Sequence, residues 1–456
     1  MTTNKITQTL RDSAAMRWTA LLLLASAMFF SYIFMDILSP IKDLMQSTRG
    51  WDSTAFGTMQ GSETFLNVFV FFLIFAGIIL DKMGVRFTAV LSGAVMLIGA
   101  TINWYAVTEA FMGSSLETWF NNNLNYIPGF DELGISPFYE GMPASAKFAA
   151  VGFMIFGCGV EMAGITVSRG IVKWFKGREM ALAMGSEMAL ARLGVATCMI
   201  FSPVFAKLGG DIDVSRSVAF GVVLLMIALI MFIVYFFMDK KLDAQTGEAE
   251  EKDDPFKISD LGKILTSSGF WLVALLCVLY YSAIFPFQKY AVNMLQCNLS
   301  FTEVPKDSFW ATNTVTIIQY CIMLVVAAAA FASNFSKKKS MKSGLLVVAI
   351  VALVVFCYMG YMRQSAETVF AVFPLLAVGI TPILGNYVDH KGKAASMLVL
   401  GSLLLIACHL TFAFVLPLFK GSPVGGIIIA YLTILVLGSS FSLVPASLWP
   451  SVPKLV

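Results

Sequence analysis

The chain has 456 residues, of which 58% are hydrophobic and only 13% are charged, and its formal net charge is +3. A soluble domain carries roughly 25% charged residues, so this composition excludes an ordinary soluble enzyme or binding domain. Apolar runs close to the ~20 residues that cross a bilayer recur along the whole sequence. The sequence therefore predicts an all-α, multi-pass membrane protein embedded in a lipid bilayer.

Twelve spans are expected in chain order. Their ranges are 18–39, 62–80, 87–107, 147–172, 180–206, 216–238, 269–288, 312–333, 343–361, 367–388, 394–416 and 424–447. The segment 108–146, which is rich in Asn, Gly and aromatic residues, is interpreted either as a folded lid or as a surface insertion. The charged segment 239–268 is interpreted as a cytoplasmic linker between two six-helix bundles, 1–238 and 269–456.

A short pattern, G-x-x-x-D-x-x-G, occurs twice where one apolar run ends and the next begins. The first copy runs from Gly77 through Asp81 to Gly84, and the second from Gly385 through Asp389 to Gly392. Such a repeat predicts two pseudo-symmetric halves. Most Lys and Arg residues fall on one side of the predicted topology, which favours a cytoplasmic N-terminus.

The register of the repeat predicts a departure from a plain six-plus-six arrangement. The first copy follows the second span, but the second copy follows the tenth span rather than the eighth. We therefore expect an inserted two-helix hairpin at 312–361 in the second half. By the same count, the last two helices of the second bundle are expected to be absent.

The turn at Asp81, Lys82, Gly84 and Arg86 resembles the signature of the major facilitator superfamily. Further stretches resemble the MFSD-one-type branch of dipeptide transporters, whose animal members are lysosomal. These stretches are Ser31–Asp36, Trp174–Glu179, Ala189–Gly194, Tyr280–Phe287 and Ser447–Pro450. The resemblance implies a major facilitator fold and a monomeric transporter of small peptides. It implies no cofactor, metal or nucleic-acid partner, and the missing animal N-terminal extension points to a bacterial inner-membrane member.

Two charged residues in the fourth and fifth spans are the first candidates for a substrate site. The short turn that joins these spans places Glu161 and Arg192 at nearly the same depth, because each helical residue adds ~1.5 Å. An acid and a permanently charged guanidinium at mid-membrane suit the ammonium and carboxylate of a free peptide. The resemblance implies the same roles, while the alternative is a structural ion pair between the two spans.

Other polar residues are weaker candidates. Substrate contact is expected of Tyr32 and Asp36, with a helix-end cap as the alternative for Asp36. In the second half it is considered for Lys289, with snorkelling to the membrane surface as an equal alternative, and for Tyr281, with a packing or interface role as the alternative. Proton coupling is considered for Glu161, Asp36 and His409, although a packing histidine is the alternative for His409. Gating residues are expected at Asp81, Lys82, Gly84, Arg86, Asp389 and Lys393, with Arg169 and Glu187 as a compensating pair near the inner gate.

Three functions remain open from the sequence. The first is a secondary transporter of dipeptides or short peptides that works by alternating access. The second is a carrier of amino acids, organic anions or drugs, because one fold hosts many substrates. The third is a non-transporting sensor or scaffold. An enzyme is not expected, since the sequence has no phosphate loop, no H-E-x-x-H and no nucleophile–histidine set.

Overall fold

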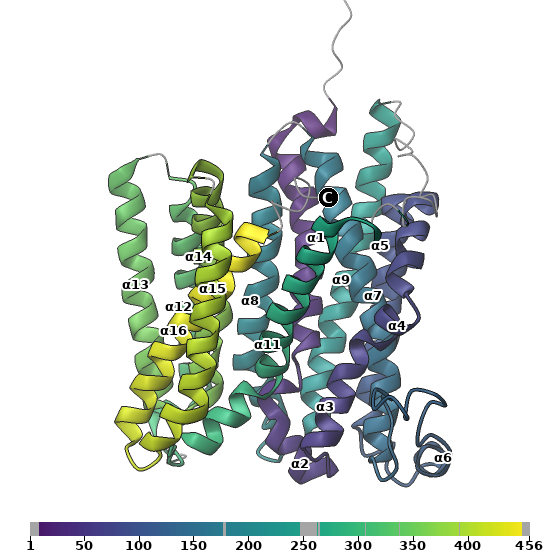
Figure 1. The fold of residues 1–456 in the computed structure, drawn as a ribbon, viewed down its shortest axis with the longest axis vertical. Helices are drawn as coiled ribbons and strands as arrows, with labels where there is room; N and C mark the ends of the chain where they lie inside the picture. Colours follow the sequence, from purple (N-terminus) through teal and green to yellow (C-terminus); the bar gives the residue numbers. More distant parts are fainter. Residues whose placement is uncertain are drawn as a thin grey trace, which may run out of the picture. The chain divides into compact units, whose positions relative to one another are not determined.

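The computed structural model describes residues 9–176, 179–246, 262, 265–305, 307–336, 338–391 and 393–448. Within these residues, ten helices are long and apolar enough to cross a membrane, and Ala366–Thr381 is a shorter apolar helix. The predicted all-α membrane protein is thereby confirmed, and Figure 1 shows the helices in the order of the chain.

The helices form two compact units. Unit 1 comprises Met1–Gly194 and Val204–Phe256, and unit 2 comprises Val195–Pro203 and Lys257–Val456. The helices of unit 1 are α1 (Ala14–Met35), α2 (Lys42–Arg49), α3 (Ser53–Gly61), α4 (Phe65–Phe69), α5 (Phe72–Ala106), α6 (Ser115–Asn123), α7 (Ala144–Phe175), α9 (Val214–Thr246) and most of α8 (Met180–Ala206). Short 3₁₀ turns lie at Leu10–Asp12 (η1), Ser39–Ile41 (η2) and Ser62–Thr64 (η3).

In unit 1, α5 packs against α7 and α9, and α1 packs against the same two helices (Figure 1). We call the end of unit 1 at which α1 begins the near end, and the opposite end, which carries α6, the far end. Close packing depends on glycine: a Cβ at Gly152 of α7 would lie 2.7 Å from the carbonyl oxygen of Gly99 on α5. The backbones of these two helices are therefore in direct contact.

The turn predicted between the second and third spans is centred on Gly84. The range of α5 contains two helices that meet in a kink at this residue, whose φ of 79° and ψ of 168° lie outside the helical region. Glycine adopts this positive φ without the steric cost that a side chain would impose. The signature turn therefore joins two helices, one on each side of Gly84.

Unit 2 contains α11 (Ser268–Asn298), α12 (Asn313–Ser333), α13 (Lys339–Met362), α14 (Ala366–Lys391), α15 (Ala394–Leu410) and α16 (Pro423–Leu448). A 3₁₀ turn lies at Phe309–Ala311 (η4). A π-helical turn at Thr411–Val415 (η5) and a 3₁₀ turn at Leu416–Phe419 (η6) follow α15. The predicted hairpin 312–361 corresponds to α12 and α13, which pack against each other and also against α14. Its status as an insertion stays a prediction.

The boundaries of the predicted linker differ from the structure. We expected 239–268 to be a linker, but α9 continues to Thr246, because Asp239 and Asp243 bind basic side chains of unit 1 and keep this turn attached. Most of the remaining linker lies outside the described residues. The segment 108–146 is folded: it contains α6, and Phe111 and Phe120 pack against Phe148.

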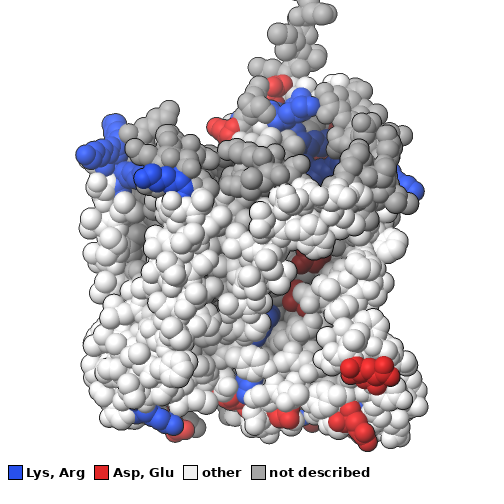
Figure 2. All heavy atoms as spheres, viewed as in Figure 1, with Lys and Arg blue, Asp and Glu red and all other residues white. Residues whose placement is uncertain are grey.

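Charged side chains are concentrated towards the ends of the helices, as Figure 2 shows for one face of the molecule. The lengths between the ends expose large apolar side chains, such as Leu272, which is 71% exposed, and Val354, which is 62% exposed. A soluble surface would bury these groups, whereas lipid tails solvate them. This distribution is that of a helix bundle with apolar, lipid-compatible outer faces.

Candidate functional site

The polar centre of unit 1 is built by α1, α7 and α8. Glu161 lies near the middle of α7, and Arg192 lies near the middle of α8. The backbone of α8 approaches α1 closely, because a Cβ at Gly194 would lie 2.4 Å from the carbonyl oxygen of Phe29. This approach sets the height at which α8 faces Tyr32 of α1.

Arg192 and Tyr32 are in contact. The guanidinium carbon of Arg192 lies 5.6 Å from the centroid of the Tyr32 ring, which is a cation–π geometry. The aromatic ring supports the planar guanidinium from one side, and the edge with its N–H donors remains available for a planar anion. Both side chains are only partly buried within the protein.

Several charges converge on the Tyr32 hydroxyl. Arg192, Glu187, Glu161 and Glu63 all act on it electrostatically, so the four charged groups lie around the same side chain. The structure thus brings together Glu161, Arg192 and Tyr32, three residues that the sequence had singled out. Glu187 belongs to this group as well, since Arg192 also acts on its carboxyl group.

Asp36 occupies a different position from Tyr32. It is the C-cap residue of α1 and has no exposed surface. Ser39 donates from its hydroxyl to a carboxylate oxygen of Asp36 at 3.4 Å, and from its backbone N–H to the Asp36 carbonyl at 2.9 Å. This geometry is that of a helix-end cap, the alternative that the sequence left open, and a role in substrate contact stays a prediction.

The gating residues of the first repeat lie in an ion-pair network at the near end. Asp81 accepts from the guanidinium of Arg169 on α7. Arg86 pairs with Asp243 of α9 at 2.6 Å. Arg169 has a partner in Asp81, and Arg192 acts on the carboxyl group of Glu187. The expected compensation between Arg169 and Glu187 stays a prediction.

The centre of this network is Asp239, which was not among the predicted site residues. Its carboxylate accepts from Lys173 at 2.6 Å, from the Trp174 indole at 2.8 Å and from the Tyr235 hydroxyl at 3.2 Å. Lys173 also contacts Asp243 at 2.8 Å. One feature of the sequence could have identified Asp239: it lies four residues before Asp243, so both are on one helix face, directly after an apolar run.

In unit 2, both ring nitrogens of His409 on α15 lie close to carbonyl oxygens. Nδ1 lies 3.0 Å from the carbonyl of Leu405 and Nε2 lies 3.0 Å from the carbonyl of Ala283 on α11. The ring also contacts Phe287 edge-on at 5.1 Å. The Phe287 contact is one of packing, and proton coupling at His409 stays a prediction.

The other predicted residues of unit 2 are Tyr281, Lys289, Asp389 and Lys393. Tyr281 stacks on Phe285, with a centroid separation of 5.1 Å. Lys289 is partly exposed and Lys393 is exposed. The side chain of Asp389 lies outside the part of the chain that the structure describes.

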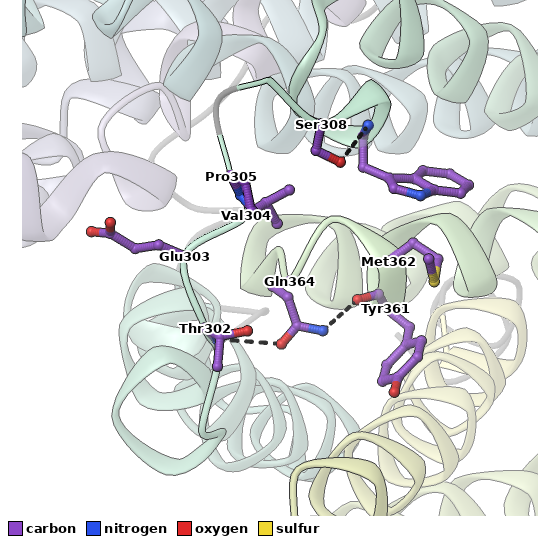
Figure 3. Close-up of a pocket in the computed structure, with 9 residues that line it drawn as sticks. Thr302, Glu303, Val304, Pro305, Ser308, Tyr361, Met362 and Gln364 are labelled. Carbon is purple, nitrogen blue, oxygen red and sulfur yellow. Dashed lines mark hydrogen bonds between the residues drawn. The ribbon is translucent and has the colours of Figure 1, made fainter.

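Unit 2 also has an open pocket of ≈ 310 Å³. Figure 3 shows that loop residues form much of it, with Thr302 bonded to Gln364 and Gln364 donating to the Tyr361 carbonyl. The pocket contains none of the predicted site residues. It lies in the connections that precede α12 and follow α13, so it is a surface feature of the helix ends.

The fold and the near-end turn agree with a known family of membrane proteins. The model of the Major Facilitator Superfamily matches residues 24–365, a range that includes 312–361. The chain therefore belongs to the Major Facilitator Superfamily. A solved structure of the xylose transporter XylE from E. coli is 11% identical with a TM-score of 0.52, covers 96% of this chain and 87% of that chain, and supports the fold.

The curated relatives are more specific in name. The lysosomal dipeptide transporter MFSD1 of Bos taurus is 23% identical over 314 residues, which is 67% of this chain and 52% of the bovine protein. MFSD1 of Homo sapiens is 21% identical over 313 residues, again 67% of this chain and 52% of the relative. This chain thus spans about half the length of the curated relatives it matches. The relatives and the matched structure are transporters, not enzymes.

Proposed function

We propose that this protein is a secondary transporter that moves dipeptides or similar short peptides by alternating access. The observation that carries the proposal is the convergence of Glu161 and Arg192 on Tyr32 in the polar centre of unit 1. A zwitterion with a free amino and a free carboxyl group needs one acid and one fixed cation in this arrangement. The names of the MFSD1 relatives support the same substrate class.

In this proposal Glu161 binds the ammonium group and Arg192 binds the carboxylate, with the Tyr32 ring supporting the guanidinium. We further propose a cytoplasmic N-terminus, so that the near end faces the cytoplasm. The basic residues Arg86, Arg169 and Lys173 at the near end support this orientation. A bacterial inner-membrane location and a monomeric state are also proposed. Asp389 and Lys393 are proposed to mirror the first gating turn.

The test is counterflow of a labelled dipeptide in proteoliposomes containing the full chain. Alanyl-alanine is expected to exchange, whereas its N-acetylated and C-amidated forms and single amino acids are not. Glu161→Gln and Arg192→Lys are each expected to weaken binding by roughly 10- to 100-fold, because each loses a charge-assisted or bidentate contact. Glu132→Gln, which removes an exposed loop carboxylate, is the matched control and is expected to behave as wild type.

Binding of the blocked dipeptides with unchanged affinity would show that the peptide termini are not recognised by this pair. Exchange of single amino acids in preference to dipeptides would favour the wider carrier class. The same liposomes with and without a pH gradient test coupling to protons at Glu161, Asp36 or His409. Uptake that is independent of the gradient would rule out a coupled proton.

A further inference from the structure

A groove between α5 and α9 lies on the outer surface of unit 1. Its volume is ≈ 390 Å³, and every side chain that lines it is apolar. On α5 the lining includes Phe87, Leu91 and Ala94, whose spacings of three and four residues put them on one helix face. On α9 it includes Ile233 and Phe237, which are one turn apart. Two apolar helix faces thus form the two walls of the groove.

The groove runs from the near end towards the middle of the bundle. Phe87 directly follows Arg86 of the near-end network, and Ala94 lies seven residues further, which is ~10 Å along the helix axis. One leaflet of the hydrocarbon core is ~15 Å deep, half of the ~30 Å of the whole core. Phe87 is 42% exposed and Phe237 is 64% exposed, so the groove opens outwards. An apolar depression of this length and direction suits an acyl chain.

The packing of α5 on α9 fixes the shape of the groove. A Cβ at Gly93 of α5 would lie 3.0 Å from the Phe232 ring and 3.1 Å from the Leu229 side chain, so the two helices approach each other closely at this point. The walls are therefore held in place by the helices themselves. A preformed groove binds an apolar chain without first having to order its own side chains and backbone.

Two lysines of α9 continue the groove wall at the near end. Lys240 follows Phe236, and Lys241 follows Phe237, each by four residues, so each lysine lies one turn beyond a phenylalanine of the wall. Both lysines are exposed. Helical side chains lean towards the N-terminus of their helix, which directs the lysine stems back over the phenylalanines. The apolar stems can cover the rings while the ammonium groups stay at the surface.

The acids of the same turn of α9 are engaged elsewhere. Asp239 has no exposed surface and binds Lys173 at 2.6 Å. Asp243 pairs with Arg86 at 2.6 Å and with Lys173 at 2.8 Å. The last turns of α9 thus direct their carboxylates to basic side chains of α5 and α7, whereas the exposed lysines lie beyond the groove. The acids of this turn do not neutralise those two lysines.

We propose that this groove binds one phospholipid with an anionic headgroup. One acyl chain lies between the walls formed by α5 and α9, and the phosphate oxygens accept from the ammonium groups of Lys240 and Lys241. A headgroup of net negative charge is preferred to a zwitterionic one, because two adjacent cations attract anionic lipid and repel a second ammonium group. The site is separate from the Tyr32 centre and does not depend on which substrate is transported.

Native mass spectrometry of the purified full chain tests the lipid and its headgroup. The protein is titrated with phosphatidylglycerol and with phosphatidylcholine, both carrying two oleoyl chains. One saturable phosphatidylglycerol is expected to bind with a Kd roughly tenfold lower than that of phosphatidylcholine. Glycerophosphoglycerol, which is the same headgroup without acyl chains, is not expected to compete, because the chain occupies the groove.

Substitutions assign the headgroup preference to the two lysines. Lys240→Gln combined with Lys241→Gln is expected to reduce the preference to within about twofold and to leave phosphatidylcholine binding unchanged. Lys338→Gln combined with Lys339→Gln removes two adjacent, exposed lysines at the start of α13 and is the matched control. It should retain the full preference.

A second substitution tests the groove itself. Ala94→Phe fills the groove and is expected to weaken both lipids by roughly tenfold without changing their ratio. Val354→Phe, on an exposed apolar face of α13, is its control and should leave lipid binding as in wild type. The lysine variants are surface changes and carry the test alone if Ala94→Phe does not fold.

The outcomes decide between this lipid and other occupants. Equal binding of the two lipids by wild type, or a preference that survives in the Lys240–Lys241 variant, overturns the proposal. An equal loss of preference in the Lys338–Lys339 control overturns it as well. Competition by glycerophosphoglycerol would show a site for a free phosphate group. A dimer mass that Ala94→Phe converts to the monomer would show that a second copy of the chain covers the groove in place of lipid.

Discussion

Asp239 is a carboxylate that unit 1 stabilises inside an apolar bundle. It has no exposed surface, and three donors from two helices reach it: Lys173, Trp174 and Tyr235. A buried charge is stable only when it is paired and fully hydrogen-bonded. At the residue scale, the near end of unit 1 therefore depends on one acid that ties α9 to α7.

Asp239→Ala is expected to lower the free energy of unfolding by roughly 2–4 kcal/mol. The substitution removes the ion pair with Lys173 and leaves the Trp174 indole N–H and the Tyr235 hydroxyl buried without an acceptor. Thermal unfolding of the purified protein in detergent measures the change. Asp211→Asn is the control, since its carboxylate is 66% exposed in its pair with Arg216 and should leave the melting temperature unchanged. A melting temperature for Asp239→Ala equal to wild type would contradict the role.

At the residue scale, the sequence predicts the depth of a side chain from its distance along a helix. Glu161 and Arg192 could be placed at one depth because a short turn joins their helices and the helical rise is constant. The partners of Arg169 and the burial of Glu63 could not, since both depend on how α3, η3 and α5 rotate against α7. Such rotation is set by packing, which a sequence pattern does not specify.

At the scale of elements, glycine sets the distance between α7 and its neighbours. At Gly157 the backbone of η3 occupies the space that a side chain would need, whereas a Cβ at Gly164, two turns further along α7, would meet nothing within 4 Å. Both positions are glycines of α7, but the atoms that surround them differ. Close approach at Gly157 is what places Glu63 beside Glu161.

Gly157→Ala and Gly164→Ala are expected to have opposite effects. The methyl group at Gly157 overlaps the Glu63 carbonyl, so η3 must move away from α7, at a cost of about 1–3 kcal/mol or more. At Gly164 the methyl group meets no atom, and alanine is favoured over glycine in a helix by about 1 kcal/mol. Thermal unfolding of the two variants compares them directly. Similar melting temperatures for both would show that η3 does not pack on α7 at this point.

The sequence predicts the helices better than it predicts the connections between them. Long apolar runs indicated the positions of α7, α8 and α12 within a few residues, because lipid exposure requires continuous apolar stretches. The helical extension of α9 to Thr246 was missed. It is decided by ion pairs with other helices, not by hydrophobicity.

For the whole molecule, the near-end ion pairs determine what can move as one body. Asp81 with Arg169 and Arg86 with Asp243 connect α5, α7 and α9 on either side of Gly84. Alternating access in this architecture is a rocking of one bundle against the other. A bundle whose helix ends are tied together transmits that motion as a rigid unit, so these pairs should affect the rate of the conformational cycle and not the affinity of the substrate site.

A charge swap at Asp81 and Arg169 tests this separation of rate from affinity. Asp81→Arg and Arg169→Asp alone each place like charges together and are expected to slow dipeptide counterflow by roughly tenfold, within the 0.5–3 kcal/mol range of contacting pairs. The double variant restores opposite charges and is expected to regain most of the rate. Dipeptide affinity by calorimetry should remain near wild type in all three variants, since neither residue is part of the Tyr32 centre. If the single variants instead lose affinity while exchange of the bound dipeptide stays fast, or if the double variant is slower than both, these ion pairs do not control the motion of unit 1.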